Sequence, residues 1–183
     1  GADVTILDKS LARLKELDGL YGPGLKTLYS TADNIEFELA HSDLVIGAVL
    51  IPGAAAPRLV TRDMLALLPR GAVLVDVAID QGGCFETSHA TTHQQPTFEV
   101  DGIVHYCVAN MPGAVARTST FALTNATLPF IQALANKGWQ QALQQDEHLA
   151  RGLNVHQGQL VCQAVAEAHG LSHSSLEQLL TTN

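Results

Sequence analysis

Asp8 closes the strand-like run Gly1–Asp8 and is a candidate for binding the ribose of a nucleotide. In a dinucleotide-binding fold, a carboxylate at the tip of the second strand accepts hydrogen bonds from the ribose hydroxyls of the adenosine and repels a 2′-phosphate. An aspartate at the end of a strand can equally cap the helix that follows. Lys9 and Arg13 could instead favour a cofactor that carries the 2′-phosphate, so the residues alone leave these roles open.

Asp80 begins the segment Asp80-Gln81-Gly82-Gly83, which follows the apolar run Ala72–Ile79. Ligands of open α/β sheets bind at the carboxyl ends of the strands. Glycines let the backbone approach a ligand closely, and a carboxylate there can exchange protons or orient water. The alternative is a simple turn capped by an aspartate. Asp76 lies within the run and is expected to be a structural group with satisfied hydrogen bonds.

The segment Asn110-Met111-Pro112-Gly113 ends the last strand candidate. A turn placed there would line a cleft between two domains, where the asparagine and backbone groups could hold an amide such as nicotinamide. The alternative is a plain Pro-Gly turn.

His89 and His93 are four residues apart, a spacing that would place two metal ligands on one face of a helix. Thr91, Thr92 and Pro96 favour a loop instead, and the sequence shows no third ligand. We therefore expect no metal site. Cys84 is expected to be a buried thiol and not a nucleophile, because no Cys-His-Asn order accompanies it.

The elements that must position these residues alternate between strands and helices. The strand candidates are Gly1–Asp8, Leu25–Tyr29, Asp43–Ile51 and Ala72–Ile79, and the helix candidates are Ser10–Tyr21, Asn34–Ala40 and Thr61–Leu68. Strands that are apolar on both faces and separated by helices are typical of a parallel sheet covered on both sides. The expected fold is α/β, a doubly wound, Rossmann-like parallel sheet. It is incomplete, because no G-x-G-x-x-G turn precedes a helix.

The later part of the chain is expected to be mainly helical. Two short strands are predicted between Phe98 and Val108, around Asp101-Gly102. A helix follows from Thr118, with Pro129 marking a kink or a junction of two helices. Its buried face would comprise Ala122, Leu123, Ala126, Leu128 and Ile131. Residues 139–183 are helical by composition. A boundary near Arg117 would separate domain 1–117 from domain 118–183.

Composition narrows the classes of partner and the compartment. The net charge of −8 gives no broad basic surface for nucleic acid. The apolar stretch Leu44–Ala56 is too short to span a bilayer and is broken by Pro52 and Gly53, so it is read as a buried strand and no membrane segment is expected. The three cysteines are far apart and odd in number, which fits a reducing cytoplasm.

Four long runs resemble bacterial alanine dehydrogenase. They are DLVIGAVLIPGAAAPRLVT (Asp43–Thr61), VDVAIDQGGCFETSHATTH (Val75–His93), VHYCVANMPGAVARTSTFALTNATLP (Val104–Pro129) and LANKG (Leu134–Gly138). The resemblance is strong from Gly1 to about Gly138 and continues more loosely towards Gly170. The nucleotide-binding subunit of the membrane transhydrogenase is a related alternative, which would make the chain a nucleotide-binding module without catalysis.

The resemblance implies an NAD-dependent oxidative deamination, in which L-alanine, NAD and water give pyruvate, ammonium and NADH. It implies that Asp80 is the catalytic carboxylate that handles protons with the attacking water. The positions that would contact NAD are Asp8, Arg13, Ser30, Val49, Leu50, Val77, Ala78, Ile79, Asp80, His89, Val108, Ala109, Asn110 and Met111. Some relatives carry an arginine at the position of His89, so its role stays open.

The chain departs from the family at its front. A complete alanine dehydrogenase begins with a substrate domain, followed by the first Rossmann strand and its Gly-rich turn. The resemblance therefore implies a C-terminal fragment, inactive alone and completed by an N-terminal part of the same enzyme; the family forms homohexamers. Without the first strand, its two neighbours should expose apolar side chains and unpaired backbone.

Overall fold

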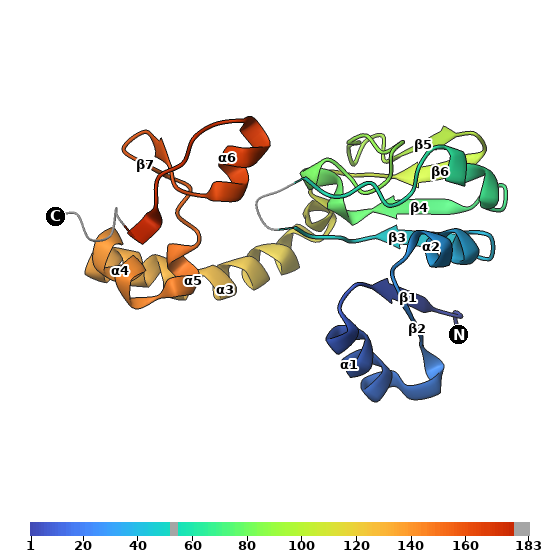
Figure 1. Ribbon diagram of the computed structural model, residues 1–183, viewed down its shortest axis with the longest axis horizontal. Coiled ribbons are helices and arrows are strands. Elements are labelled where there is room, and N and C mark those ends of the chain that lie inside the picture. Colours follow the sequence, from blue (N-terminus) through green and yellow to red (C-terminus); the bar gives the residue numbers. More distant parts are fainter. Residues whose placement is uncertain (52–54, 178–183) are drawn as a thin grey trace. The chain divides into compact units, whose positions relative to one another are not determined.

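The computed structural model describes residues 1–51 and 55–177, which form two compact units (Figure 1). The first unit comprises Gly1–Leu50 and Ala56–Ala109. The second contains the described residues from Asn110 onward, together with Ile51 and Ala55. Pro52 and Gly53, which are expected to break an apolar run, lie outside the described residues, as does the end of the predicted helical part from residue 178.

The first unit begins with two parallel strands and the helices that follow them. The elements are β1 (Thr5–Asp8), α1 (Leu11–Tyr21), the 3-10 turn η1 (Gly22–Gly24), β2 (Lys26–Tyr29) and α2 (Ala32–Leu39). The hydroxyl of Ser10 caps α1 by accepting a hydrogen bond from the backbone of Arg13, and Leu14 and Leu17 face inward. The predicted alternation of strand and helix is confirmed here.

A second, four-stranded sheet in the same unit has the order β3-β4-β6-β5. Its strands are β3 (Leu44–Gly47), β4 (Val73–Asp76), β5 (Thr97–Val100) and β6 (Ile103–Tyr106). β3, β4 and β6 are parallel, whereas β5 runs antiparallel to β6 around the Asp101-Gly102 turn. Leu74, Phe85 and Ile103 are fully buried in its core. The predicted α/β class with a parallel sheet is confirmed.

The two sheets of the first unit are separate. Within the described residues, β1 pairs with β2 alone and β3 with β4 alone, so each has an edge without a strand partner. On β3, Leu44 and Ile46 are 55% and 60% exposed. A doubly wound sheet places its first strand between these two edges. The exposed apolar side chains of β3 are those expected of a sheet that lacks this strand.

Three predicted elements of the first unit end earlier or take another form. The strand predicted over Asp43–Ile51 ends at Gly47, and it is not buried, because Leu44 and Ile46 are exposed. The strand predicted to Ile79 ends at Asp76, and Val77–Gln81 forms the 3-10 turn η3, closed by Gly82 at φ 90°. The helix predicted over Thr61–Leu68 is the shorter 3-10 turn η2, Asp63–Leu67. Pro69 explains the early end, because a proline disfavours the helical conformation of the residue before it.

The second unit begins with the 3-10 turn η4 (Met111–Val115) and the long helix α3 (Ala116–Lys137). α3 is one helix that contains Pro129, and not two helices joined there. The predicted buried face is wrong: none of its residues is buried, and Leu123 and Ile131 are 66% and 57% exposed. Among the described residues, the main contacts of α3 are with η4 and α4, its neighbours at either end.

The rest of the second unit contains α4 (Trp139–Gln145), α5 (Glu147–Ala150), β7 (Val155–His156), β8 (Gln159–Leu160) and α6 (Gln163–His169). The β7–β8 hairpin corrects the prediction that residues 139–183 are helical, interrupted by breaks at Gly152, Gly158 and Gly170. Gln157 and Gly158 both have positive φ, as a tight hairpin turn requires. The predicted boundary near Arg117 lies in the first turn of α3, whereas the change of unit falls between Ala109 and Asn110.

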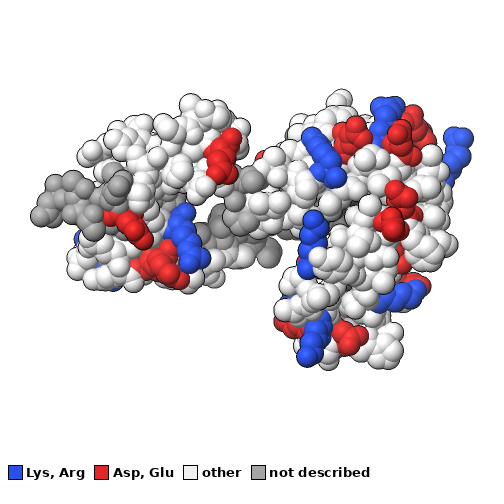
Figure 2. Space-filling model, in the orientation of Figure 1, with Lys and Arg blue, Asp and Glu red and all other residues white. Residues whose placement is uncertain are grey.

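No helix among the described residues is long and apolar enough to cross a membrane. On the face shown in Figure 2, basic and acidic side chains are interspersed over a largely uncharged surface.

Candidate functional site

The tips of β1 and β2 bring together three of the predicted nucleotide-binding residues. The Asp8 carboxylate accepts a 2.7 Å hydrogen bond from the backbone of Ser10, which is itself the cap of α1, so Asp8 supports the start of this helix without capping it. The backbone of Ser30 donates to the carbonyl of Asp8 at 3.0 Å. Arg13 bonds to Glu16 at 2.6 Å along its own helix, and this bond raises the pKa of its guanidinium. Asp8 stays partly accessible at this tip.

Asp76 ends β4 with its carboxylate fully buried. One oxygen, Oδ2, accepts hydrogen bonds from the backbone of Cys84 at 2.9 Å and from the hydroxyl of Ser88 at 2.6 Å. Oδ1 lies 3.5 Å from the Cys84 thiol. Burial, followed by the Asp76 carboxylate, raises the pKa of Cys84 to about 12. The expectations that Asp76 is a satisfied structural group and that Cys84 is a buried thiol are both confirmed.

The turn η3 places Asp80 at the carboxyl end of β4, on the surface. Val77 and Asp80 are exposed, whereas Ala78 and Ile79 pack inward. The Gln81 side-chain oxygen is buried and has no hydrogen-bond partner within the described residues. A buried acceptor left unpaired costs about 1–3 kcal/mol.

The predicted positions after β3 lie beside a tightly packed glycine. Gly47 ends β3, and a methyl group there would collide with the thiol of Cys84 and approach the Phe85 ring to 2.7 Å. The chain can pass this close because the residue is glycine. Beyond it, Val49 is partly buried and Leu50 is 69% exposed.

A short parallel bridge joins the segment after His89 to the end of β6. Thr91 donates from its backbone to Cys107 at 2.9 Å and accepts from Ala109 at 3.1 Å. The exposed His89 ring lies against Phe98, with ring centroids 3.7 Å apart and the rings tilted by 31°. His89 and Ala109 thus lie on neighbouring segments.

The remaining predicted residues follow the end of β6. Val108 is fully buried and Asn110 adopts a left-handed conformation, with φ 56°, before the turn η4 that begins at Met111. The expectation that this turn lines a cleft between domains stays a prediction.

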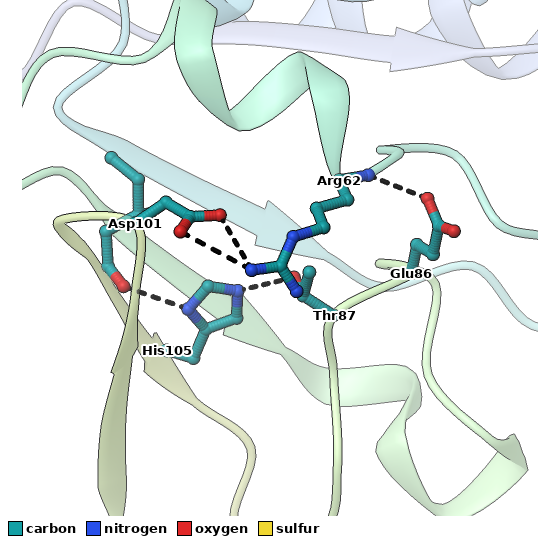
Figure 3. A network of polar contacts seen from close by, with 6 residues as sticks. Arg62, Glu86, Thr87, Asp101 and His105 are labelled. Atoms are coloured by element: carbon teal, nitrogen blue, oxygen red, sulfur yellow. Dashed lines mark hydrogen bonds and ion pairs between the residues drawn. The ribbon is translucent and has the colours of Figure 1, made fainter.

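A polar network fastens the loop after Gly83 to its surroundings (Figure 3). His105 is fully buried in β6, with Nδ1 3.0 Å from the Ile103 carbonyl and Nε2 2.7 Å from the Thr87 hydroxyl. A carbonyl only accepts hydrogen bonds, so Nδ1 carries the proton and Nε2 accepts from Thr87. Burial lowers the pKa of His105, which keeps the ring neutral. Its role is structural.

On the opposite side of the loop, the Glu86 carboxylate accepts a 2.7 Å hydrogen bond from the backbone of Arg62. The Arg62 guanidinium pairs with Asp101 at 3.0 Å (Figure 3). A hollow of about 350 Å³ lies there, lined by Arg62, Asp63, Leu65, Ala66 and Asp101, none of which is a predicted site residue. Within the described ranges, no cluster of three or more metal-ligating side chains occurs.

Comparison with known proteins decides the family. The model of the family described as "Alanine dehydrogenase/PNT, C-terminal domain" matches residues 1–163. The chain belongs to this family. Two curated relatives are alanine dehydrogenases of Halomonas elongata, 66% identical over 180 residues, and of Mycolicibacterium smegmatis, 53% identical over 180 residues. Each alignment covers 98% of this chain and 48% of the relative, so the chain spans about half the length of these proteins.

Solved structures of the family agree with the fold. An L-alanine dehydrogenase aligns with a TM-score of 0.79 and 50% identity, over 93% of this chain and 47% of that one. A transhydrogenase from Sinorhizobium meliloti aligns with a TM-score of 0.67 and 28% identity, over 90% of this chain and 43% of the other. The resemblance to alanine dehydrogenase stated from the sequence is confirmed.

Sequence reasoning missed the side chains that hold the site together. Ser88 and Thr87 bind Asp76 and His105, which lie 12 and 18 residues away along the chain. A hydroxyl pair in a loop carries no periodic signal, so no local pattern selects these two residues. The one usable signal was the pair of glycines at 82 and 83, which marks a loop that passes close to other atoms.

Proposed function

We propose that this chain is the nucleotide-binding part of an NAD-dependent alanine dehydrogenase. The reaction is L-alanine, NAD and water giving pyruvate, ammonium, NADH and a proton. The observation that carries the proposal is the exposed Asp80 on a fixed turn at the carboxyl end of β4, in a chain 66% identical to an alanine dehydrogenase. The lower identity to the transhydrogenase, 28%, makes a non-catalytic nucleotide module the second candidate.

The residues present fit NAD. The partly accessible Asp8 would accept hydrogen bonds from the adenosine ribose, with Arg13 and Ser30 at the same strand tips. The other contact positions proposed are Val49, Leu50, Val77, Ala78, Ile79, Asp80, His89, Val108, Ala109, Asn110 and Met111. When bound, NAD accepts the hydride that leaves the α-carbon of alanine.

Asp80 would carry the proton chemistry. Its carboxylate is exposed, so it can meet a water molecule and a substrate. As a general base it takes a proton from the water that attacks the oxidised α-carbon, and as a general acid it returns a proton when ammonia leaves. The buried Ala78 and Ile79 anchor the turn beneath it.

The chain would work as the C-terminal half of a longer polypeptide. Two observations support this proposal. The chain spans about half the length of its relatives, and among the described residues β1 and β3 each have an edge without a strand partner. An N-terminal part would supply the strand between these edges and the residues that grip L-alanine or pyruvate. We also propose a homohexamer in the cytoplasm, as the family resemblance implies; the buried thiols of Cys84 and Cys107 suit a reducing compartment.

The test compares the complete protein with the 183-residue chain. Alanine-dependent formation of NADH, followed by its absorbance, should occur with the complete protein and be absent with the chain alone. NADH binding by the complete protein without alanine-dependent turnover would contradict the enzyme and favour the nucleotide module. Turnover by the pure chain would contradict the need for an N-terminal part.

A further inference from the structure

We infer that Asp76 is a positioning residue that holds the Asp80 turn in its working geometry. This inference rests on the proposed function, because it assigns to Asp80 the proton transfer described above. Asp76 itself is fully buried beneath the turn. It therefore acts through the backbone and not on the substrate.

The contacts of Asp76 join the segments of chain that lie before and after Asp80. Asp76 precedes the turn η3, and its Oδ2 accepts a hydrogen bond from the backbone of Cys84, eight residues later, at 2.9 Å. The backbone of Phe85 also points to Oδ2, at 3.4 Å. The carboxylate thus joins the chain before the turn to the chain after it. Asp80 lies between these two anchored points.

Hydrogen bonds within the turn η3 and the two glycines after it also hold its shape. The backbone groups of Gly82 and Gly83 donate to Ile79 and Ala78, each at 3.0 Å. At Gly83, φ is 78° and an added methyl group would lie 2.7 Å from Asp76 Oδ2. The loop therefore runs against the carboxylate with no room for a side chain. A small displacement of Asp76 would shift the turn that carries Asp80.

The chemistry of position 76 favours a carboxylate or its close mimic. Three donors converge on Oδ2: the backbone groups of Cys84 and Phe85 and the hydroxyl of Ser88. Alanine would remove the acceptor of the buried Cys84 and Phe85 backbone groups and of the half-buried Ser88 hydroxyl, and buried donors without a partner are costly. Asparagine has the same shape and keeps one acceptor oxygen, so it can retain these bonds with its amide turned towards the Cys84 thiol.

A double-mutant cycle in the complete protein tests the inference. Asp76→Ala should lower kcat by roughly 100-fold, the loss expected for a misplaced catalytic group, with a smaller change in KM. In an Asp80→Asn background it should lower kcat no further, because the group it positions is already lost. Asp76→Asn should restore most of the activity. Asp63→Ala, which removes an exposed aspartate from η2, is the matched control and should keep wild-type kcat.

An equal fractional loss of kcat in both backgrounds would overturn the inference, because a general loss of folded protein acts regardless of Asp80. If Asp76→Ala fails to fold, Ser88→Ala replaces it in the double-mutant cycle with Asp80→Asn. Ser88→Ala removes one of the three donors to Asp76 Oδ2.

Hydrogen exchange separates this inference from the proposed function. If Asp80→Asn leaves kcat unchanged, the proposed function fails, and exchange alone decides the role of Asp76. Asp76→Ala should speed exchange of the Cys84 and Phe85 amides by about tenfold or more, whereas Asp76→Asn should keep them protected. If the Cys84 and Phe85 amides exchange at the wild-type rate in Asp76→Ala, Asp76 does not hold the turn and the inference is overturned.

Discussion

The backbone of Ser30 donates a 3.0 Å hydrogen bond to the carbonyl of Asp8, which fastens the tip of β2 to the tip of β1. The Asp8 carboxylate in turn accepts from the backbone of Ser10, 2.7 Å away. One aspartate therefore serves the local fold and, in the proposed function, the adenosine ribose. The two roles can be separated experimentally because only the second depends on the negative charge.

Asp8→Asn should weaken NAD binding while keeping the start of α1 intact. The asparagine oxygen can still accept from Ser10, but the ribose loses a charged acceptor worth about 1.5–3 kcal/mol, which is roughly 10- to 100-fold in affinity. Binding of NADP should improve relative to NAD, because the 2′-phosphate is no longer repelled. Fluorescence titration of the complete protein with NADH and NADPH measures both. An unchanged ratio of the two dissociation constants would remove Asp8 from the ribose site.

Gly47→Ala should destabilise the complete protein. The new methyl group would collide with the Cys84 thiol and the Phe85 ring, both fully buried, and such overpacking costs about 1–3 kcal/mol. Gly19→Ala is the matched control, because Gly19 lies within α1 with open space around it. That change should be neutral or stabilising by about 0.5–1 kcal/mol. Thermal unfolding compares the two, and equal melting temperatures would contradict the close approach at Gly47.

His105 should make the folded protein less stable as the pH falls. Burial lowers its pKa in the folded state below the ordinary value, so the unfolded chain takes up a proton first. Stability is then lost as the pH drops through about 6.5, the ordinary histidine pKa, towards the lower folded value. His105→Gln removes this titration. Melting temperatures measured between about pH 7 and pH 5 should fall more steeply for the wild type than for His105→Gln. Parallel curves would show that His105 is not held neutral by the fold.

Local patterns predicted the elements well where periodicity and turn residues coincide. The β5–β6 hairpin around Asp101-Gly102 and the helix α1 that follows Ser10 depend on signals within a few residues. The end of β4 could not be predicted in this way. Val77, Ala78 and Ile79 are apolar like the strand before them, and the chain turns at Asp76 because that carboxylate binds a residue eight positions later.

Burial depends on partners that a periodic pattern cannot supply. The apolar residues of α3 predict a buried face, yet Leu123 and Ile131 are exposed because the packed neighbours of α3 lie at its ends. The β7–β8 hairpin was missed because its strands have two residues each, too few to show alternation. Contacts distant in sequence, such as Ser88 with Asp76, were beyond any local pattern.

The most direct measurement of the central claim is the turnover of Asp80→Asn in the complete protein. Asparagine keeps the shape of the side chain but cannot exchange a proton, so kcat for alanine-dependent NAD reduction should fall by roughly 100- to 10,000-fold. The dissociation constant for NADH should stay within about threefold of wild type, because the buried anchors of the turn are untouched. An unchanged kcat would show that the proton chemistry belongs to another group and would contradict the account.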